Sequence, residues 1–149
     1  MTTVTSPLAG RAIGLAAVPD AVFSAALAGP GTALDPVRAP AAAVAPVDGV
    51  VVSLLPHAFV VVDARGRGVL THLGIDTVRL PGGGFEPLVA PGGTVRRGDA
   101  VVRWDPRAVV AAGRSPVCPV VALEAAAGSL TELVEDGDAR PGDALFVWT

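Results

Sequence analysis

An internal repeat is the feature that most restricts how this 149-residue chain can fold. Residues 93–104 align without gaps on residues 137–148, with two glycines, an Asp, an Ala and a Trp identical. A shorter pair, Ser6–Gly10 and Ala45–Gly49, repeats as well. Each long copy holds a Gly-Asp pair, which is typical of a tight turn that requires a positive φ. The repeat predicts two copies of one β unit, with Trp104 and Trp148 in equivalent positions at strand ends.

Turn residues indicate short strands rather than long helices, since the chain contains 18 Gly and 14 Pro. Apolar runs rich in β-branched residues predict strands at Gly10–Leu15, Gly49–Leu54, Ala58–Asp63, Gly68–Leu73, Ala100–Trp104, Val117–Leu123 and Ala144–Trp148. Short helical turns are predicted at Pro106–Gly113, capped by Asp105, and at Ser129–Val134. We therefore expect one all-β domain over residues 1–149, a compact antiparallel sandwich or barrel built from a duplicated motif.

Composition excludes several classes of function. All 11 basic residues are Arg, so lysine Schiff bases, the P-loop lysine and lysine-tethered biotin or lipoyl groups are excluded. The net charge of −3 gives no electrostatic basis for nucleic-acid binding. No apolar stretch approaches the ~20 residues of a membrane span, and no signal peptide is evident. A single cysteine, Cys118, suits a reducing cytoplasm.

The only two histidines, His57 and His72, flank a predicted strand-turn-strand hairpin. If the hairpin loop holds an even number of residues, both imidazoles project from one face. Their Cβ atoms would then lie about 5 Å apart when directly opposed, or about 7–8 Å apart when diagonal. Two neighbouring imidazoles can hold a metal or perform nucleophilic and acid–base chemistry. A zinc site needs three or four protein ligands, and the sequence contains no HxH, HExxH or CxxC motif to complete one.

The run Thr71-His72-Leu73-Gly74-Ile75-Asp76-Thr77-Val78 resembles the phosphorylation-site signature of the glucose-type EIIA proteins of the bacterial sugar phosphotransferase system. Pro56-His57-Ala58-Phe59 resembles the segment that holds the second histidine of that family, fifteen residues earlier. Residues 18–23, 29–31 and 45–49 match as well, so the resemblance extends over nearly the whole chain. Leu55 and Pro56 stand where the family usually has a Thr. The resemblance implies an antiparallel β sandwich with a duplicated motif.

The resemblance also implies a division of roles. His72 would accept a phosphoryl group on Nε2, the backbone near Gly74 would orient its ring through Nδ1–H, and His57 would stabilise the transferred group. Asp76 would lie at the rim of the site, although a turn-forming role suits it better. An apolar docking face would include Val22, Phe23, Leu27, Leu70 and Val78.

The implied function is that of a cytoplasmic phosphocarrier. It would take the phosphoryl group from phospho-HPr and pass it to an EIIB domain of the glucose or N-acetylglucosamine type. Its phosphorylation state could also regulate permeases or enzymes that bind it. We expect no obligatory cofactor, although His57 and His72 could bind Zn²⁺ with a carboxylate from a partner. We expect neither nucleic-acid binding nor stable membrane insertion. Two alternatives remain: a zinc-dependent peptidase of the LytM type, and a regulatory binding module without catalytic activity.

Overall fold

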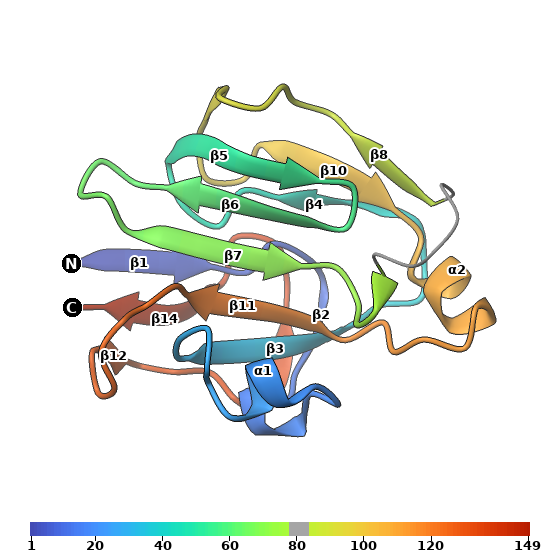
Figure 1. The fold of residues 1–149 in the computed structure, drawn as a ribbon, viewed down its shortest axis with the longest axis horizontal. Helices are drawn as coiled ribbons and strands as arrows, with labels where there is room; N and C mark the ends of the chain where they lie inside the picture. The colour runs from blue at the N-terminus through green and yellow to red at the C-terminus, as the bar shows by residue number, and fades with distance from the viewer. Residues whose placement is uncertain (78–83) are drawn as a thin grey trace.

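The computed structural model describes residues 1–77 and 84–149, and strands dominate it (Figure 1). One eight-stranded sheet has the order β13-β2-β3-β11-β7-β6-β5-β9, and two three-stranded sheets have the orders β1-β14-β12 and β4-β10-β8. The strands are β1 Thr2–Thr5, β2 Gly10–Ala12, β3 Gly31–Pro36, β4 Ala41–Val44, β5 Gly49–Leu55, β6 Ala58–Val62, β7 Gly68–His72, β8 Phe85–Pro87, β9 Thr94–Val95, β10 Ala100–Trp104, β11 Cys118–Ala122, β12 Leu130–Thr131, β13 Gly137–Ala139 and β14 Ala144–Trp148. The helical turns are η1 Leu15–Ala17, α1 Ala21–Ser24 and α2 Pro106–Ala111.

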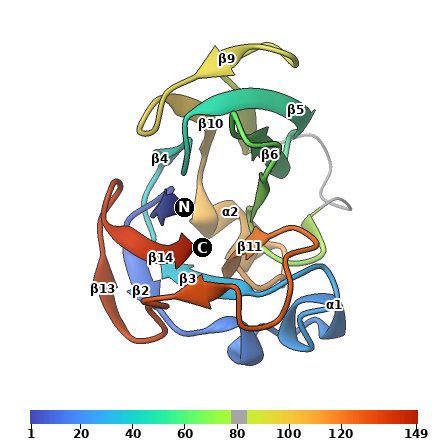
Figure 2. The same ribbon diagram turned by 90° about the vertical axis from the view of Figure 1, so that its left-hand side faces the viewer.

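The sheets form the two layers of a sandwich. The large sheet makes one layer and the two small sheets make the other, as the end-on view shows (Figure 2). The main core lies between the layers and is built from side chains of both, among them Phe59, Val61 and Val120 from the large sheet and Val4 and Phe146 from a small one. Every paired strand is antiparallel to its neighbour, and the sheets of the described residues do not close into a barrel. The all-β sandwich predicted from the sequence is confirmed.

The duplication is confirmed in the strand register. Trp148 pairs with Thr2 on β1, and Trp104 pairs with Ala41 on β4, with an irregularity at the corresponding place in each ladder. Each Trp is buried at the end of its strand. The turns before the two strands are also alike, because Asp99 accepts from the Arg96 amide at 2.8 Å and Asp143 accepts from the Arg140 amide at 2.9 Å. The two repeated segments therefore form the same local structure.

Some boundaries differ from the prediction. The first predicted strand ends at Ala12, and residues 15–17 turn into η1, because Gly14 takes a φ of 78°. Residues 129–134 do not form a helix; Leu130–Thr131 pairs with β14 as an edge strand instead. The helical turn after Asp105 is confirmed as α2, with the Asp105 side chain accepting from the Arg107 amide. No helix of the described residues is both long and apolar enough to span a membrane.

A second apolar cluster covers the outer face of the large sheet. It joins Leu15, Val18 and Phe23 of the η1–α1 segment to Ala33, Ile75 and Val121. This explains why all five residues of β11 are buried: the main core covers one face and the η1–α1 segment covers the other. The helical turn α1, which the sequence did not predict, lies in front of β3 (Figure 1), and its Phe23 ring contacts His72 at the end of β7.

Candidate functional site

The two histidines lie on different structural elements, His72 on a strand and His57 in a turn. His72 is the last residue of β7 and pairs with Ala58, the first residue of β6. Residues 63–67, an odd number, form the hairpin loop, so the even loop on which the parity argument depended is not present. His57 lies with Pro56 in the turn between β5 and β6, outside the strand alternation. Its carbonyl oxygen accepts from the Leu73 amide at 2.7 Å, which brings the turn next to the end of β7.

The His72 ring has aromatic neighbours on two elements. The centroids of the His57 and His72 rings are 5.2 Å apart at an interplanar angle of 72°, so the two rings meet edge to face. The centroid of the Phe23 ring, on α1, is also 5.2 Å from that of His72, with an interplanar angle of 58°. Phe23 is 7% exposed, so it acts as packing for His72 rather than as an open docking residue. The expectation that the two imidazoles lie together agrees with this geometry.

Gly74 fixes the orientation of the His72 ring. His72 Nδ1 lies 2.5 Å from the Gly74 carbonyl oxygen. A carbonyl oxygen only accepts, so Nδ1 carries the proton, and in the neutral ring Nε2 keeps its lone pair. Gly74 has a φ of 78°, and a Cβ there would lie 2.7 Å from Thr77 Cγ2 and 3.0 Å from the Ser115 carbonyl oxygen. Only glycine suits this position.

The loop that follows His72 is held on both sides. The Thr77 hydroxyl donates to the Leu73 carbonyl oxygen at 2.9 Å, within the loop. The Ile75 amide donates to the Ser115 carbonyl oxygen at 2.8 Å, which ties the loop to the segment before β11. These bonds restrict the position of the Gly74 carbonyl and, through it, the His72 ring.

Burial lowers the pKa of both imidazoles. Desolvation is the main cause of the lowered pKa of His72, and it outweighs the opposing effects of the Gly74 carbonyl and of two nearby carboxylates, Asp20 and Asp76. The pKa of His57 is lowered by burial and then by the charge of His72. Both rings are therefore neutral at pH 7, where a neutral imidazole is a nucleophile.

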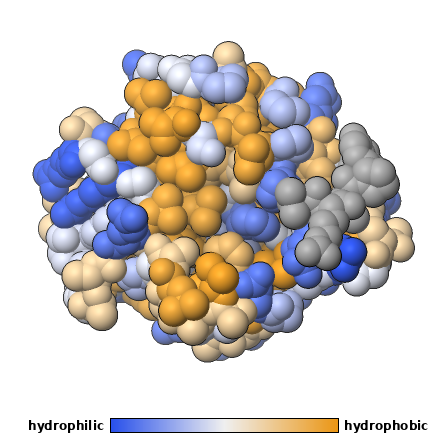
Figure 3. All heavy atoms as spheres, in the orientation of Figure 1, coloured by the Kyte–Doolittle hydropathy of each residue, from blue (hydrophilic) through white to orange (hydrophobic). Residues whose placement is uncertain are grey.

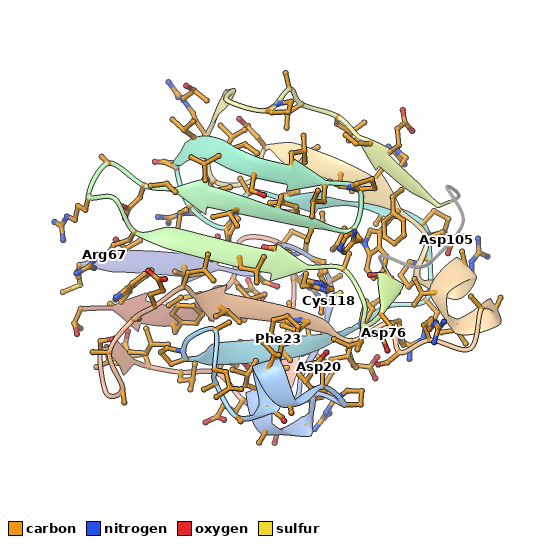
Figure 4. The ribbon with its side chains drawn as sticks, viewed as in Figure 1. Asp20, Phe23, Arg67, Asp76, Asp105 and Cys118 are labelled. Carbon is orange, nitrogen blue, oxygen red and sulfur yellow. The ribbon has the colours of Figure 1, made fainter. Side chains whose placement is uncertain are left out.

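Two carboxylates flank the site, one of which the sequence did not single out. Asp20 caps α1, since its side chain accepts from the Val22 amide at 2.9 Å. Asp76 is exposed and has a φ of 58°, so the position forms a turn, the role that the sequence favoured. Figure 4 shows Asp20 at α1 and Asp76 in the loop after β7. The signal for Asp20 was its place as a capping residue before an apolar turn.

Exposed apolar side chains surround the site. Val22 and Leu27 are 49% and 73% exposed, and Leu70 on β7 is half-buried. Val78 lies outside the described residues. Apolar side chains extend across this face from β5 and β6 to α1 (Figure 3), and on β5 they include the exposed Val50 and Val52. Scattered apolar residues are normal on a surface, but a continuous patch of this kind is typical of a protein-binding site.

The site offers an incomplete set of metal ligands. Two imidazoles lie together, but no group of three His, Cys, Asp or Glu side chains in residues 1–77 and 84–149 could hold a metal ion. A zinc peptidase needs three protein ligands at its catalytic ion. The described residues therefore lack a site of that kind.

Comparison with known proteins identifies relatives over most of the chain. The chain is 35% identical over 121 residues to a glucose-specific EIIA component from Bacillus cereus, which covers 80% of this chain and 72% of that protein. It is 42% identical over 121 residues to a beta-glucoside-specific EIIBCA component from Dickeya chrysanthemi, but this covers only 19% of that longer protein. The structure of glucose permease IIA from Mycoplasma capricolum matches with a TM-score of 0.88 and 33% identity, covering 99% of this chain and 95% of that chain.

The family model of the phosphoenolpyruvate-dependent sugar phosphotransferase system, EIIA 1, matches residues 2–127, a range that includes His57, His72 and α1. The similarity in sequence and in structure leads to the same assignment. The chain belongs to the EIIA 1 family of the sugar phosphotransferase system.

Proposed function

We propose that residues 1–149 act as one cytoplasmic phosphocarrier domain, which takes a phosphoryl group from phospho-HPr onto His72 Nε2 and passes it to a sugar-specific EIIB domain. The observation that carries this proposal is the contact of 2.5 Å between His72 Nδ1 and the Gly74 carbonyl oxygen. It holds the ring in the tautomer with a free Nε2 lone pair, which is the form that an in-line displacement at phosphorus requires.

In the transfer, the Nε2 lone pair forms a bond to phosphorus as the bond between phosphorus and the donor histidine breaks. The donor keeps the electron pair of that bond. The proton on Nδ1 stays on His72 and continues to donate to the Gly74 carbonyl. In this proposal His57 donates to the oxygens of the transferred group, and the distance of 5.2 Å between the centroids of the His57 and His72 rings supports this role. The reverse displacement, at a nucleophile on the EIIB domain, releases the group.

The surface around His72 suits transient binding of protein partners. Val22 and Leu27 supply exposed apolar area, and Asp20 and Asp76 supply negative charge beside it. Apolar contact excludes the water that would hydrolyse a phosphoimidazole, and carboxylates attract basic side chains of a partner. The same surface supports a second function: permeases or enzymes could bind it in the unphosphorylated state, because phosphorylation adds a dianion at its centre.

Intact mass spectrometry after incubation with phosphoenolpyruvate, enzyme I and HPr tests the proposal. We expect one added phosphoryl mass, labile in acid and stable in base, and its loss in His72→Ala. A normal mass shift in that variant would refute the assignment of His72.

Zinc binding at the two imidazoles is an optional property of the same site. A complete tetrahedral site would need a carboxylate from a partner and a water molecule. Calorimetry of the protein alone should therefore detect weak Zn²⁺ binding at most. A tight stoichiometric site would instead favour the zinc peptidase alternative.

A further inference from the structure

The ring of Phe23 packs directly on the imidazole of His72. The two ring centroids lie 5.2 Å apart, and the interplanar angle is 58°. Aromatic rings at such a separation and tilt attract each other beyond the gain from their buried area. Phe23 belongs to α1, in front of the large sheet (Figure 4), whereas His72 ends β7. A side chain distant in sequence therefore forms part of the immediate surroundings of the proposed nucleophile.

The position of Phe23 is fixed from within the protein. Its side chain is 7% exposed and belongs to the second apolar cluster, on the outer face of the large sheet. Asp20 holds the backbone of α1, because its carboxylate accepts from the Val22 amide at 2.9 Å and its carbonyl oxygen accepts from the Phe23 amide at 3.1 Å. The cluster and the helix cap thus hold the ring in place without the help of a partner protein.

One hydrogen bond leaves the tilt of the His72 ring undetermined. The Gly74 carbonyl oxygen restrains Nδ1, but the ring can still rotate about the line between Cβ and Nδ1, and this rotation moves Nε2. The terminal torsion of an imidazole is broad, so the side chain itself sets no sharp preference. Contacts with the ring must therefore supply the restraint, and Phe23 is one of the two aromatic neighbours that provide it.

We propose that Phe23 is a positioning residue for phosphoryl transfer, whose ring fixes the tilt of the His72 imidazole and so aims Nε2 at the incoming phosphorus. The role rests on the proposed function for its effect on transfer. Displacement at phosphorus depends steeply on such alignment, because the reacting atoms must meet within a narrow range of distance and angle. Phe23 differs in this from Val22, its neighbour on the same helical turn, which is 49% exposed and offers its surface to a partner.

The ring of Phe23 also keeps water away from His72. Desolvation is the largest cause of the lowered pKa of His72. The titratable groups around the imidazole are His57, in the turn before β6, and the carboxylates Asp20 and Asp76, which raise the pKa of His72. A smaller side chain at position 23 would admit water to the imidazole while these three groups remain. The pKa of His72 should therefore rise when Phe23 is replaced by an aliphatic residue.

Three variants separate positioning from docking and from packing. Phe23→Leu removes the ring but keeps an apolar side chain in the cluster. Val22→Ala shortens an exposed residue of the same helical turn and is the docking control. Leu15→Val removes volume from the same apolar cluster, in η1, and is the packing control. If Phe23→Leu does not fold, Phe23→Met, which also lacks a ring, takes its place.

The first readout is single-turnover acceptance from phospho-HPr, measured over a range of donor concentrations. We expect Phe23→Leu to lower the rate at saturation about tenfold, the scale of one lost aromatic contact, and to leave the half-saturating concentration unchanged. Val22→Ala should raise the half-saturating concentration and keep the saturated rate. Leu15→Val should lower the thermal midpoint and leave both kinetic values at those of the wild type.

The second readout is the pH titration of His72 in the unphosphorylated protein, followed by ¹H–¹⁵N NMR. The midpoint should move to higher pH in Phe23→Leu, because the imidazole loses part of its apolar cover. It should stay at the wild-type value in Val22→Ala and in Leu15→Val. This readout needs no phosphoryl donor, so it tests the contact between the two rings independently of transfer.

A wild-type rate at saturation in Phe23→Leu, with a raised half-saturating concentration, would overturn the proposal and make Phe23 a docking residue. An unchanged titration of His72 in Phe23→Leu, or the same loss of rate in Leu15→Val, would overturn it as well. Failure of the proposed function has a different signature. The wild type would then take no phosphoryl group, while the titration of His72 would still depend on Phe23.

Discussion

Replacement of Gly74 by Ala tests whether the loop after β7 holds His72 in its reactive orientation. The added Cβ would lie 2.7 Å from Thr77 Cγ2, 3.0 Å from the Ser115 carbonyl oxygen and 3.3 Å from Val109 Cγ1. The Thr77 side chain cannot rotate away freely, because its hydroxyl donates to the Leu73 carbonyl. Ser115 is equally constrained, because its carbonyl accepts from Ile75. The loop itself must therefore move.

The magnitude follows from two contributions. A non-glycine residue at a φ of 78° costs about 1–2 kcal/mol, and overpacking of a buried site costs about 1–3 kcal/mol more. Alanine also lowers the conformational entropy of the unfolded chain, which stabilises the folded state by about 0.5–1 kcal/mol. We expect Gly74→Ala to lower the free energy of unfolding by about 2–4 kcal/mol. Gly66→Ala is the matched control, with a φ of 80° and no atom within 4 Å of its Cβ, and should cost about 1 kcal/mol or less.

Chemical denaturation of both variants measures the loss of stability. The rate of phosphoryl acceptance, at a temperature where both variants are folded, measures the effect on the orientation of His72. A displacement of the Gly74 carbonyl by about 1 Å should slow acceptance roughly 10²-fold in Gly74→Ala and leave Gly66→Ala at the wild-type rate. If the two variants lose similar stability and both transfer at the wild-type rate, the loop does not orient His72 and the argument from Gly74 is wrong.

Three further predictions concern the same strand end. His57→Gln should still accept a phosphoryl group but pass it to EIIB roughly 10²–10³-fold more slowly, since only the second step depends on His57 as a hydrogen-bond donor. Single-turnover rates of the two steps check this. A block of acceptance as complete as in His72→Ala would contradict it. Thr71→Val should raise the free energy of unfolding by about 1 kcal/mol, because the buried Thr71 hydroxyl has no hydrogen-bond partner among the described residues. Thr32→Val should lower it, because the Thr32 hydroxyl donates to a carbonyl at 2.7 Å. Denaturation of both variants checks this, and a loss of stability in Thr71→Val would refute it. Stability should fall as the pH drops below about 6.5, because the lowered pKa values of both histidines mean that the unfolded chain binds more protons there; the slope should flatten in a His57→Gln, His72→Gln double variant, and an unchanged slope would contradict the assignment.

Periodicity and turn residues were sufficient to predict several strands, including those next to the two histidines. The strands β5, β6, β7, β10 and β14 lie within a residue of their predicted bounds, because each combines β-branched residues with a flanking turn signal. The repeat could be found for the same reason: the Gly-Asp turn before Trp104 and before Trp148 has a specific backbone geometry that few residues satisfy.

The remaining features depend on contacts distant in sequence. The short helical turn α1 offers one exposed and one buried apolar residue, Val22 and Phe23, and its position is set by packing on the large sheet rather than by propensity. Edge strands of two or three residues, such as β9, carry too little pattern to be recognised. The parity argument for the histidines failed for two reasons: the hairpin loop, residues 63–67, holds an odd number of residues, and His57 lies in the turn at Pro56, outside the strand alternation.

The duplicated units are nested, which bears on the order in which the protein can fold. The inner unit pairs Ala41 with Trp104, whereas the outer unit pairs Thr2 with Trp148 and so depends on residues at both ends of the described chain. Closing the longer loop costs more entropy, and β14 is synthesised after the strands of the inner unit. During translation, the inner unit and the β5–β7 segment, which holds both histidines, can therefore form before β14, the partner of β1, has been synthesised. The phosphorylatable end of the sheet would gain its local structure before the sandwich closes.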